Sequence, residues 1–380
     1  MRYRKFGKQD WEVSALGFGC MRLPVLEDGK TINEPEAIRI IRRAIDNGVN
    51  YADTAYMYHG GNSEIVLGKA LLDGYRAKVK VATKFPLWKV ESADDYDKTL
   101  DNQLKKLQTS YLDYYLFHGV GAPGWERVLK FGLIKKAEAA VEDGRIKNIA
   151  FSFHDSYDLF VKIIDSYDKW AMCQVQYNYF DVENQAGMKG VKYAASKGLA
   201  VIAMEPLLGG RLSRPPEKVA KIFDAASKKR TYSEWALKWL WNQPEISMVL
   251  SGMSTMQQVE ENLRSADNSA VPLSAEELKT LDQAQKTYRD LIPFKCTACN
   301  YCQPCPSGVD IQWNFELYNR GYIHGKTQLE DSRKTYATLD KTGAQLCTGC
   351  AQCEEKCPQK LPISEAMPKV HSVLGENKDY

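Results

Sequence analysis

The sequence predicts an α/β protein in which a (β/α)8 barrel precedes a small, mainly α-helical domain. Short apolar segments rich in β-branched residues alternate with amphipathic helical patterns over the first three quarters of the chain. Eight of the ten cysteines lie between Cys296 and Cys357. With 380 residues the chain is longer than one average domain. We therefore expect a boundary near residue 290, giving domains 1–290 and 291–380.

Eight segments have the length and composition of strands buried on both faces. They are the segment ending at Gly19 and residues 50–54, 79–85, 112–117, 146–152, 172–177, 200–205 and 247–251. A short hairpin with its turn at Gly7-Lys8 is expected before the first.

Helical periodicity fills the intervals between these segments. In residues 34–47, Ile38, Ile41 and Ile45 share one face, and Gly48 follows the last turn. The other predicted helices are 63–72, 94–107, 125–142, 157–167, 184–197, 217–227, 232–242 and 274–288. An open, doubly wound sheet is the alternative, but no GxGxxG follows the first strand, which favours the barrel.

Composition excludes several classes of protein. The net charge is +3 and no run of Lys and Arg stands out, so neither nucleic acid nor a membrane surface is an expected partner. No apolar segment approaches the roughly 20 residues that cross a bilayer. The N-terminus lacks the apolar core of a signal peptide, so we expect a cytoplasmic protein whose cysteines are reduced metal ligands and not disulfides.

Four polar residues lie at the ends of neighbouring predicted strands: Asp53, Lys84 and His118, with Tyr58 in the loop after Asp53. Active sites of such barrels lie at this end, so the side chains are expected to meet. Lys84, held by Asp53, would lower the pKa of Tyr58. Tyr58 would then protonate a carbonyl oxygen whose carbon receives a hydride from a nicotinamide, and His118 would orient that carbonyl. Taken alone, each residue also has a purely structural interpretation: Asp53 as a strand cap, Lys84 as a solvated charge and His118 as a core histidine.

Further motifs occur in the same order: DTAxxY at 53–58, TK at 83–84, FSFHD at 151–155, QVQYN at 174–178, MEPLLGG at 204–210 and SGMSTMQQVEEN at 251–262. On these motifs, residues 1–290 resemble the aldo-keto reductase family. The resemblance implies an NAD(P)-dependent oxidoreductase that reduces a small-molecule carbonyl compound. It also implies the catalytic tetrad Asp53, Tyr58, Lys84 and His118.

The same resemblance implies a nucleotide site. Its residues would be Gly19, Cys20, Met21, Ser152, His154, Gln176, Met204, Pro206, Leu207, Gly209, Arg211, Gly252, Ser254, Gln258, Glu261 and Asn262. His154 stands where Asn is more usual, and Met204 where an aromatic ring usually stacks on the nicotinamide, although core packing also explains Met204.

The identity of the nucleotide stays open at this point. Many members of the family place Lys and Arg around the 2′-phosphate, whereas this chain has Gly252-Met253-Ser254 and Gln258. Arg211 and Arg214 are candidate cations. The family favours NADP, with NAD as the alternative.

The clustered cysteines form two motifs that each end in Cys-Pro. CTACNYCQPCP contains Cys296, Cys299, Cys302 and Cys305, and CTGCAQCEEKCP contains Cys347, Cys350, Cys353 and Cys357. The second has the spacing of bacterial ferredoxins, in which the fourth cysteine binds the other cluster. Two [4Fe–4S] clusters are thus predicted, one held by Cys296, Cys299, Cys302 and Cys357 and the other by Cys347, Cys350, Cys353 and Cys305. Structural zinc is the alternative, but it typically uses two CxxC pairs.

The helix-like segment between the motifs is similar to the two-cluster ferredoxin modules of larger dehydrogenases. The chain resembles the branch of aldo-keto reductases that carries such a C-terminal domain. Hydride transfer moves two electrons and clusters move one, so three hypotheses follow. They are a carbonyl reductase acting on an aldehyde, ketone or quinone, an electron-transfer enzyme whose clusters serve a substrate or flavin in the barrel, and a redox-sensing nicotinamide-binding protein. Besides the small-molecule substrate, a redox protein that exchanges electrons with the clusters is a candidate partner.

Overall fold

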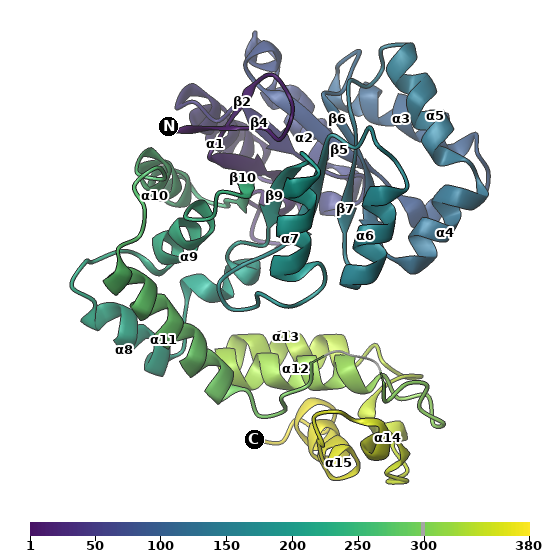
Figure 1. The fold of residues 1–380 in the computed structure, drawn as a ribbon, viewed down its shortest axis with the longest axis vertical. Coiled ribbons are helices and arrows are strands. Elements are labelled where there is room, and N and C mark those ends of the chain that lie inside the picture. Colours follow the sequence, from purple (N-terminus) through teal and green to yellow (C-terminus); the bar gives the residue numbers. More distant parts are fainter. Residues whose placement is uncertain (298–300) are drawn as a thin grey trace. The chain divides into compact units, whose positions relative to one another are not determined.

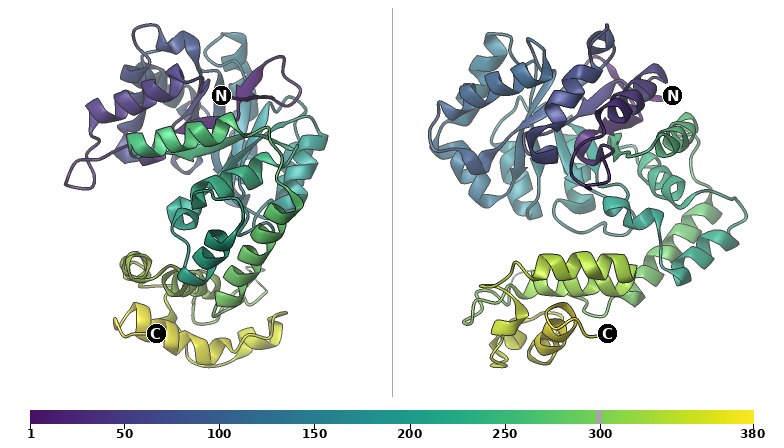
Figure 2. Two further views of the ribbon diagram at one scale, coloured as in Figure 1. Left: turned by 90° about the vertical axis from the view of Figure 1, so that its left-hand side faces the viewer. Right: turned by 180° about the vertical axis from the view of Figure 1, so that it is seen from behind.

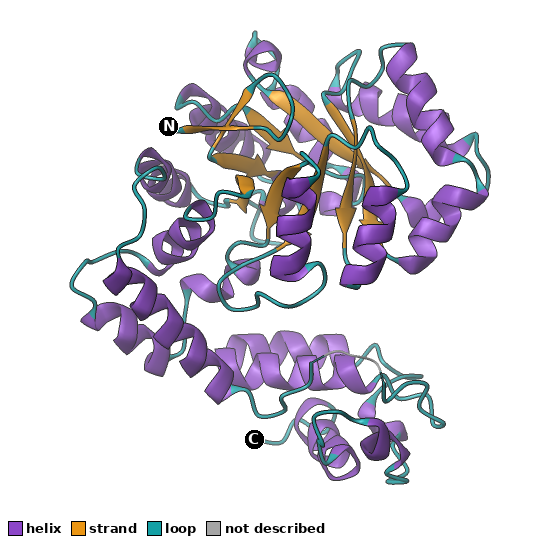
Figure 3. Cartoon of the chain, in the orientation of Figure 1, coloured by secondary structure: helices purple, strands orange, loops and turns teal. Residues whose placement is uncertain are grey.

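The computed structural model describes residues 1–297 and 301–380 (Figure 1). It divides into two compact units, Met1–Gly209 with Ser233–Leu273, and Gly210–Tyr232 with Ser274–Tyr380. Every strand of the described chain lies in the first unit, and the second is built of helices and loops (Figure 3). The domain boundary at residue 290 stays a prediction.

The first unit contains the predicted barrel. Eight parallel strands close on themselves in the order β10-β3-β4-β5-β6-β7-β8-β9, so the fold class is confirmed. The strands are β3 (Leu16–Gly19), β4 (Tyr51–Asp53), β5 (Lys80–Phe85), β6 (Tyr114–Val120), β7 (Ile149–Phe153), β8 (Met172–Gln176), β9 (Ala200–Met204) and β10 (Ile246–Gly252).

A hairpin and a group of aromatic rings fill the N-terminal end of the barrel. The hairpin pairs β1 (Tyr3–Lys5) with β2 (Glu12–Ser14) in antiparallel register. Phe6 lies 4.8 Å from Trp11 and 5.2 Å from Tyr114, measured between ring centroids. These rings pack with the buried side chains of Tyr51 and others inside the barrel. Space for chemistry is therefore expected at the opposite end, where the strands terminate.

Helices surround the strands of this unit, as the views in Figure 2 show. They are α1 (Glu34–Asp46), α2 (Ser63–Ala70), α3 (Asp95–Leu107), α4 (Ala122–Lys130), α5 (Leu133–Glu142), α6 (Tyr157–Asp165), α7 (Gly187–Ser196), α9 (Tyr232–Trp241) and α10 (Met256–Asp267). The single helix predicted at 125–142 is wrong. Gly132 has φ 60°, a left-handed conformation that ends α4 and begins α5. Sequence periodicity did not identify α10.

The second unit contains α8 (Glu217–Ala225), α11 (Ala275–Leu291), α12 (Ile311–His324), α13 (Lys326–Tyr336), α14 (Gln352–Lys356) and α15 (Ile363–Leu374). Phe315, Tyr318, Met367 and Val370 are at the centre of its small apolar core. In the described part of the chain, no helix combines the length and hydrophobicity of a bilayer-spanning segment.

Candidate functional site

A buried ion pair forms the centre of the predicted tetrad. Asp53 ends β4 and is in register with Ala82, so Lys84, two residues further along β5, faces the same side. The Lys84 Nζ lies 2.5 Å from Asp53 Oδ1 and also donates to the carbonyl of Thr54 at 2.7 Å. Both side chains are about 2% exposed. Such burial is unfavourable for two charges unless hydrogen bonds satisfy them, and here they do.

Tyr58 extends this pair by one hydrogen bond. Its hydroxyl oxygen lies 3.3 Å from Lys84 Nζ. The loop turns sharply after it, because His59 and Gly60 both have positive φ, 51° and 64°. The backbone N–H of Leu23 donates to His59 Nε2 at 3.2 Å. His59 thus fastens the loop that carries Tyr58 to the loop that follows β3.

His118 lies beside Tyr58 but not at the last position of its strand. β6 continues to Val120, with a register shift after Phe117. The ring of His118 meets that of Tyr58 nearly edge-on at 6.0 Å, and the half-exposed Trp88 lies 5.2 Å from it. Its buried Nδ1 atom has no hydrogen-bond partner within the described residues. A side chain with a free polar atom beside a phenol can hydrogen-bond a ligand.

Burial dominates the proton equilibria of these groups. Burial and the Lys84 charge lower the pKa of His118 to about 3, so its imidazole is neutral near pH 7. Burial also raises the pKa of Tyr58, and Lys84 opposes this only in part. The expected net lowering of the Tyr58 pKa is therefore wrong for the protein alone, because desolvation of the phenolate outweighs the ammonium. Tyr58 is thus a protonated phenol, and it can donate that proton.

Asp53 and Lys84 form a coupled pair. Burial alone would lower the pKa of Lys84, but Asp53 and Tyr58 raise it above its ordinary value, which keeps the ammonium charged. Burial raises the pKa of Asp53, and Lys84 and Gln174 oppose that rise. Gln174 Nε2 donates to Asp53 Oδ2 at 2.7 Å.

Sequence reasoning missed Gln174 and Trp88. Gln174 stands two residues before Gln176 in β8, so side-chain alternation places both on one face of the strand and was a usable signal. Trp88 follows Lys84 by four residues in a short 3-10 helix, η4 (Leu87–Lys89), and no periodicity marked it.

The predicted nucleotide-site residues of the first unit lie at or after the carboxyl ends of five strands. Gly19 ends β3, Gln176 ends β8, Met204 ends β9 and Gly252 ends β10, whereas Ser152 is one residue from the end of β7. Residues in the loops and helices that follow are Cys20, Met21, His154, Pro206, Leu207, Gly209, Ser254, Gln258, Glu261 and Asn262. Parallel strands bring these residues to the same end of the barrel as the tetrad.

Several of these side chains contact the protein itself. Ser152 Oγ accepts the backbone N–H of Gly119 at 2.8 Å, and Gln176 Oε1 accepts Gln185 Nε2 at 3.2 Å. Asn262 is buried and donates to Ser251 Oγ at 3.3 Å. Met204 is half-buried, so its thioether is not wholly enclosed by the core.

Arg211 belongs to the second unit. It lies in η5 (Leu208–Ser213), and its guanidinium is 3.7 Å from Glu316 of α12. Its predicted role at the nucleotide stays a prediction.

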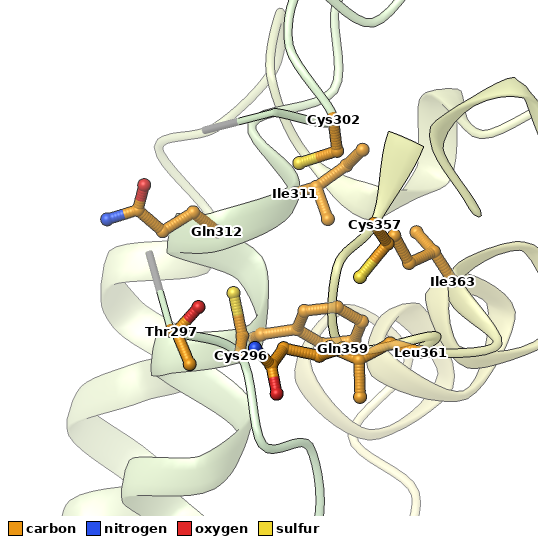
Figure 4. Close-up of a pocket in the computed structure, with 10 residues that line it drawn as sticks. Cys296, Thr297, Cys302, Ile311, Gln312, Cys357, Gln359, Leu361 and Ile363 are labelled. Atoms are coloured by element: carbon orange, nitrogen blue, oxygen red, sulfur yellow. The ribbon is translucent and has the colours of Figure 1, made fainter. Parts of the chain in front are cut away.

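Cysteines from both motifs line one pocket in the second unit. Cys296, Cys302 and Cys357 surround a cavity of about 340 Å³, counted with the space open to solvent (Figure 4). Its apolar walls are Ile311, Phe315, Leu361 and Ile363. Cys299 lies outside the described residues. All three belong to the four cysteines predicted to bind one cluster. In that prediction Cys357, the last cysteine of the second motif, binds the same cluster as the first three cysteines of the first motif.

The two motifs also meet outside this pocket. Ser307 Oγ, after the first motif, lies 3.4 Å from Thr348 Oγ1 in the second. Cys305, Cys347 and Cys353 are half-buried and Cys350 is exposed. Burial raises the pKa of Cys353 to about 11, and nearby Cys347 acts in the same direction. Among the described residues no three His, Cys, Asp or Glu side chains are close enough for a single ion. An iron–sulfur cluster spreads its thiolate ligands over several metal atoms, so it does not need the close grouping that a single ion requires.

Comparison with known families gives two matches. Residues 15–286 match the family model of the aldo/keto reductase family, and residues 295–361 match that of the 4Fe-4S dicluster domain. The predicted resemblance, and the order of its two parts, are confirmed.

Individual relatives agree with the first match. The L-galactose dehydrogenase of Arabidopsis thaliana is 28% identical over 312 residues, 76% of this chain and 92% of that protein. A solved aldo-keto reductase from Bacillus halodurans, in its holo form, has a TM-score of 0.62 at 27% identity and covers 75% of this chain and 96% of its own. An aldo/keto reductase from Klebsiella pneumoniae, in complex with NADP and acetate, has a TM-score of 0.61 at 25% identity, with coverages of 74% and 94%.

Proposed function

Because the chain belongs to the aldo/keto reductase family, we propose that it is an NADPH-dependent reductase of an aldehyde, a ketone or a quinone. The observation that carries this proposal is the hydrogen-bonded series Asp53–Lys84–Tyr58 beside a neutral His118. A protonated phenol, a buried ammonium and a neutral imidazole can together donate a proton to a carbonyl oxygen and stabilise the charge that develops.

Each side chain has a distinct task. The nicotinamide, when bound, supplies a hydride to the carbonyl carbon. The Tyr58 hydroxyl donates its proton to the carbonyl oxygen, and the Lys84 ammonium, 3.3 Å away, stabilises the phenolate that remains. Asp53 fixes Lys84 in position at 2.5 Å. His118 donates a hydrogen bond that orients the carbonyl oxygen.

The nucleotide assignment rests on two kinds of support. Residues of the predicted nucleotide site in the first unit lie at the strand ends that also hold the tetrad. The aldo/keto reductase from Klebsiella pneumoniae contains NADP. We assign NADPH to this chain, with NADH as the alternative.

We further propose that the second unit holds two [4Fe–4S] clusters, which carry one electron each when bound. Cys296, Cys299, Cys302 and Cys357 bind one, and Cys305, Cys347, Cys350 and Cys353 bind the other. The shared pocket of Cys296, Cys302 and Cys357 supports the crossing of the motifs. Its apolar walls would shield the cluster from water.

An electron-transfer enzyme is the second candidate function. Cys350, a proposed ligand, is exposed, which would bring one cluster close to the surface where a redox partner protein binds. In that case reduction of the clusters would accompany product formation, whereas in a simple carbonyl reductase it would not.

The decisive experiment compares two tyrosines of the same loop. Tyr58→Phe removes the proposed acid, whereas Tyr56→Phe removes a hydroxyl that accepts a hydrogen bond from Lys89 Nζ at 3.0 Å. Protein purified without oxygen is assayed for NADPH and NADH oxidation with aldehydes, ketones and quinones. We expect kcat to fall about 10²- to 10⁴-fold in Tyr58→Phe and to change little in Tyr56→Phe.

Equal activity of wild type and Tyr58→Phe would refute proton donation by Tyr58. Substrate-linked bleaching of the cluster absorbance would favour the electron-transfer function. Oxidation of neither nucleotide by the wild type would refute the reductase.

A further inference from the structure

Arg22 lies where three loops of the barrel unit meet. It ends η1 (Cys20–Arg22), directly after β3. Its carbonyl oxygen accepts the Ser254 hydroxyl, in the loop after β10, at 2.7 Å. Its side chain runs along Gly252, since a Cβ built on that glycine would lie 3.0 Å from Arg22 Cγ. A Cβ on Gly209, in the loop after β9, would lie 3.6 Å from an Arg22 guanidinium nitrogen.

The guanidinium of Arg22 is without a protein partner in the described part of the chain. Within residues 1–297 and 301–380 it makes no hydrogen bond and no ion pair, and the residue is exposed. Arg211, one of the two cations that the sequence suggested for this role, is instead 3.7 Å from Glu316 in the second unit. Arg22 is thus an unpaired cation held against three residues of the predicted nucleotide site: Gly209, Gly252 and Ser254.

We infer that Arg22 pairs with the 2′-phosphate of NADPH and so selects NADPH over NADH. This inference rests on the proposed function, which assigns a nicotinamide nucleotide to this end of the barrel. The segment 252–258, which the family resemblance places around the 2′-phosphate, contains no Lys or Arg. Arg22 reaches that segment from another loop, and a planar guanidinium binds phosphate oxygens in pairs.

Gly252 leaves room for this arrangement. The aliphatic part of Arg22 lies against Gly252, where any side chain would come within 3.0 Å of Arg22 Cγ or displace it. The fixed carbonyl of Arg22, bonded to Ser254, holds the base of the side chain in place. A positioned guanidinium loses less conformational freedom on binding than a mobile lysine would.

The test measures nucleotide affinity directly. NADPH and NADH are titrated by calorimetry, without oxygen, into the full chain with its clusters. Arg22→Met is compared with Lys30→Met, which removes another exposed positive charge from the same loop. We expect Arg22→Met to weaken NADPH about tenfold or more and NADH by less than about twofold. Lys30→Met should leave both nearly unchanged, and Arg22→Lys should fall between wild type and Arg22→Met.

Gly252→Ala provides a second variant that keeps the charge. By shifting the Arg22 side chain it should also reduce the preference for NADPH over NADH. Circular dichroism shows whether each variant is folded.

The inference and the proposed function fail in different ways. An equal loss for both nucleotides in Arg22→Met would place the guanidinium on the shared pyrophosphate and overturn selection by the 2′-phosphate. Unchanged binding, or a wild type that does not distinguish the two, would also overturn it while leaving the reductase intact. Loss of selectivity in Arg211→Met but not in Arg22→Met would transfer the role to Arg211. A wild type that binds neither nucleotide refutes the proposed function itself.

Discussion

The polar site of the barrel unit and the cysteine-rich region of the second unit hold their functional groups in different ways. In the barrel, Asp53 and Lys84 satisfy each other, and Gln174 and the Thr54 carbonyl complete the bonding. In the second unit, Cys296, Cys302 and Cys357 surround a pocket whose other walls are largely apolar. The barrel site is organised by its own hydrogen bonds, whereas the cysteines would be linked to one another by the clusters they are proposed to bind.

The two regions also differ in the size of the core behind them. The barrel that carries the polar site is surrounded by the main apolar core of the chain, to which all eight strands and their helices contribute. The core of the second unit is much smaller. Small cores usually need a metal or another cross-link for stability. Loss of a cluster should therefore damage the second unit far more than loss of one polar contact damages the barrel.

The largest expected effect follows from Cys357→Ala. Removing this buried cysteine should eliminate the cluster it shares with Cys296 and Cys302, and so about half of the bound iron if two clusters are present. The second unit should become sensitive to protease while the barrel keeps its thermal transition. The matched control is Cys173→Ala, a buried lone cysteine of β8 that should retain all the iron.

Iron analysis and limited proteolysis check this prediction. Full iron in Cys357→Ala would contradict the crossed arrangement of ligands. Simultaneous unfolding of both units would show that the barrel, too, depends on the clusters.

The next effect in size concerns the buried ion pair. Lys84→Met leaves the Asp53 carboxylate buried without its partner, so we expect the free energy of unfolding to fall by about 3–5 kcal/mol and turnover to be lost. The control is Lys80→Met on the same strand. It removes the half-exposed Lys80 ammonium, which lies 3.2 Å from the Asp113 carboxylate, but Asp113 keeps its second ion pair with Arg76 at 2.9 Å. That control should cost less than about 1 kcal/mol. Urea unfolding at pH 7 measures both, and equal losses would mean that the buried pair is not specially important.

Much of the fold was predictable because strands buried on both faces leave a continuous apolar signal. All eight barrel strands were located in this way, and polar residues at or near the ends of three strands marked Asp53, Lys84 and His118. The break between α4 and α5 at Gly132 was not predictable, because the apolar periodicity continues across it from Trp125 to Ala140.

Quantities that depend on tertiary surroundings were beyond the sequence. The direction of the Tyr58 pKa depends on how deeply the fold buries the phenol, which no local pattern reports. Arg22 could not be identified as a candidate site residue from the sequence, because Gly209 and Gly252, which lie beside it in the fold, are far from it along the chain. The crossing of the cysteine motifs stays a prediction from their spacing, which matches a known pattern of cluster ligands. The pocket lined by Cys296, Cys302 and Cys357 agrees with it.

A smaller effect should appear as a dependence of stability on pH. The pKa of His118 is about 3 in the folded protein and near 6.5 when unfolded. The unfolded state therefore binds the extra proton, so His118 contributes stability above about pH 6.5 that is lost as the pH falls toward 3. His118→Gln removes this dependence. Between pH 7.5 and 5.5 wild type should lose about 1 kcal/mol relative to His118→Gln, measured by urea unfolding. Parallel pH profiles of the two proteins would contradict a neutral, buried imidazole.

The smallest change in stability is expected at Gln174. It tests how much Lys84 and Gln174 each contribute to holding the Asp53 carboxylate. Gln174→Met removes the 2.7 Å hydrogen bond to Asp53 Oδ2, but it also removes a buried amide oxygen that has no partner within the described residues. These changes oppose each other, so the free energy of unfolding should fall by only about 1 kcal/mol. Because Gln174 helps to hold down the pKa of Asp53, the acidic limb of the kcat/KM profile should move to higher pH. A loss as large as that of Lys84→Met would mean that Asp53 depends on Gln174 as much as on Lys84. A small loss with a shifted profile would show that the ion pair holds the site together and that the amide only adjusts its charge.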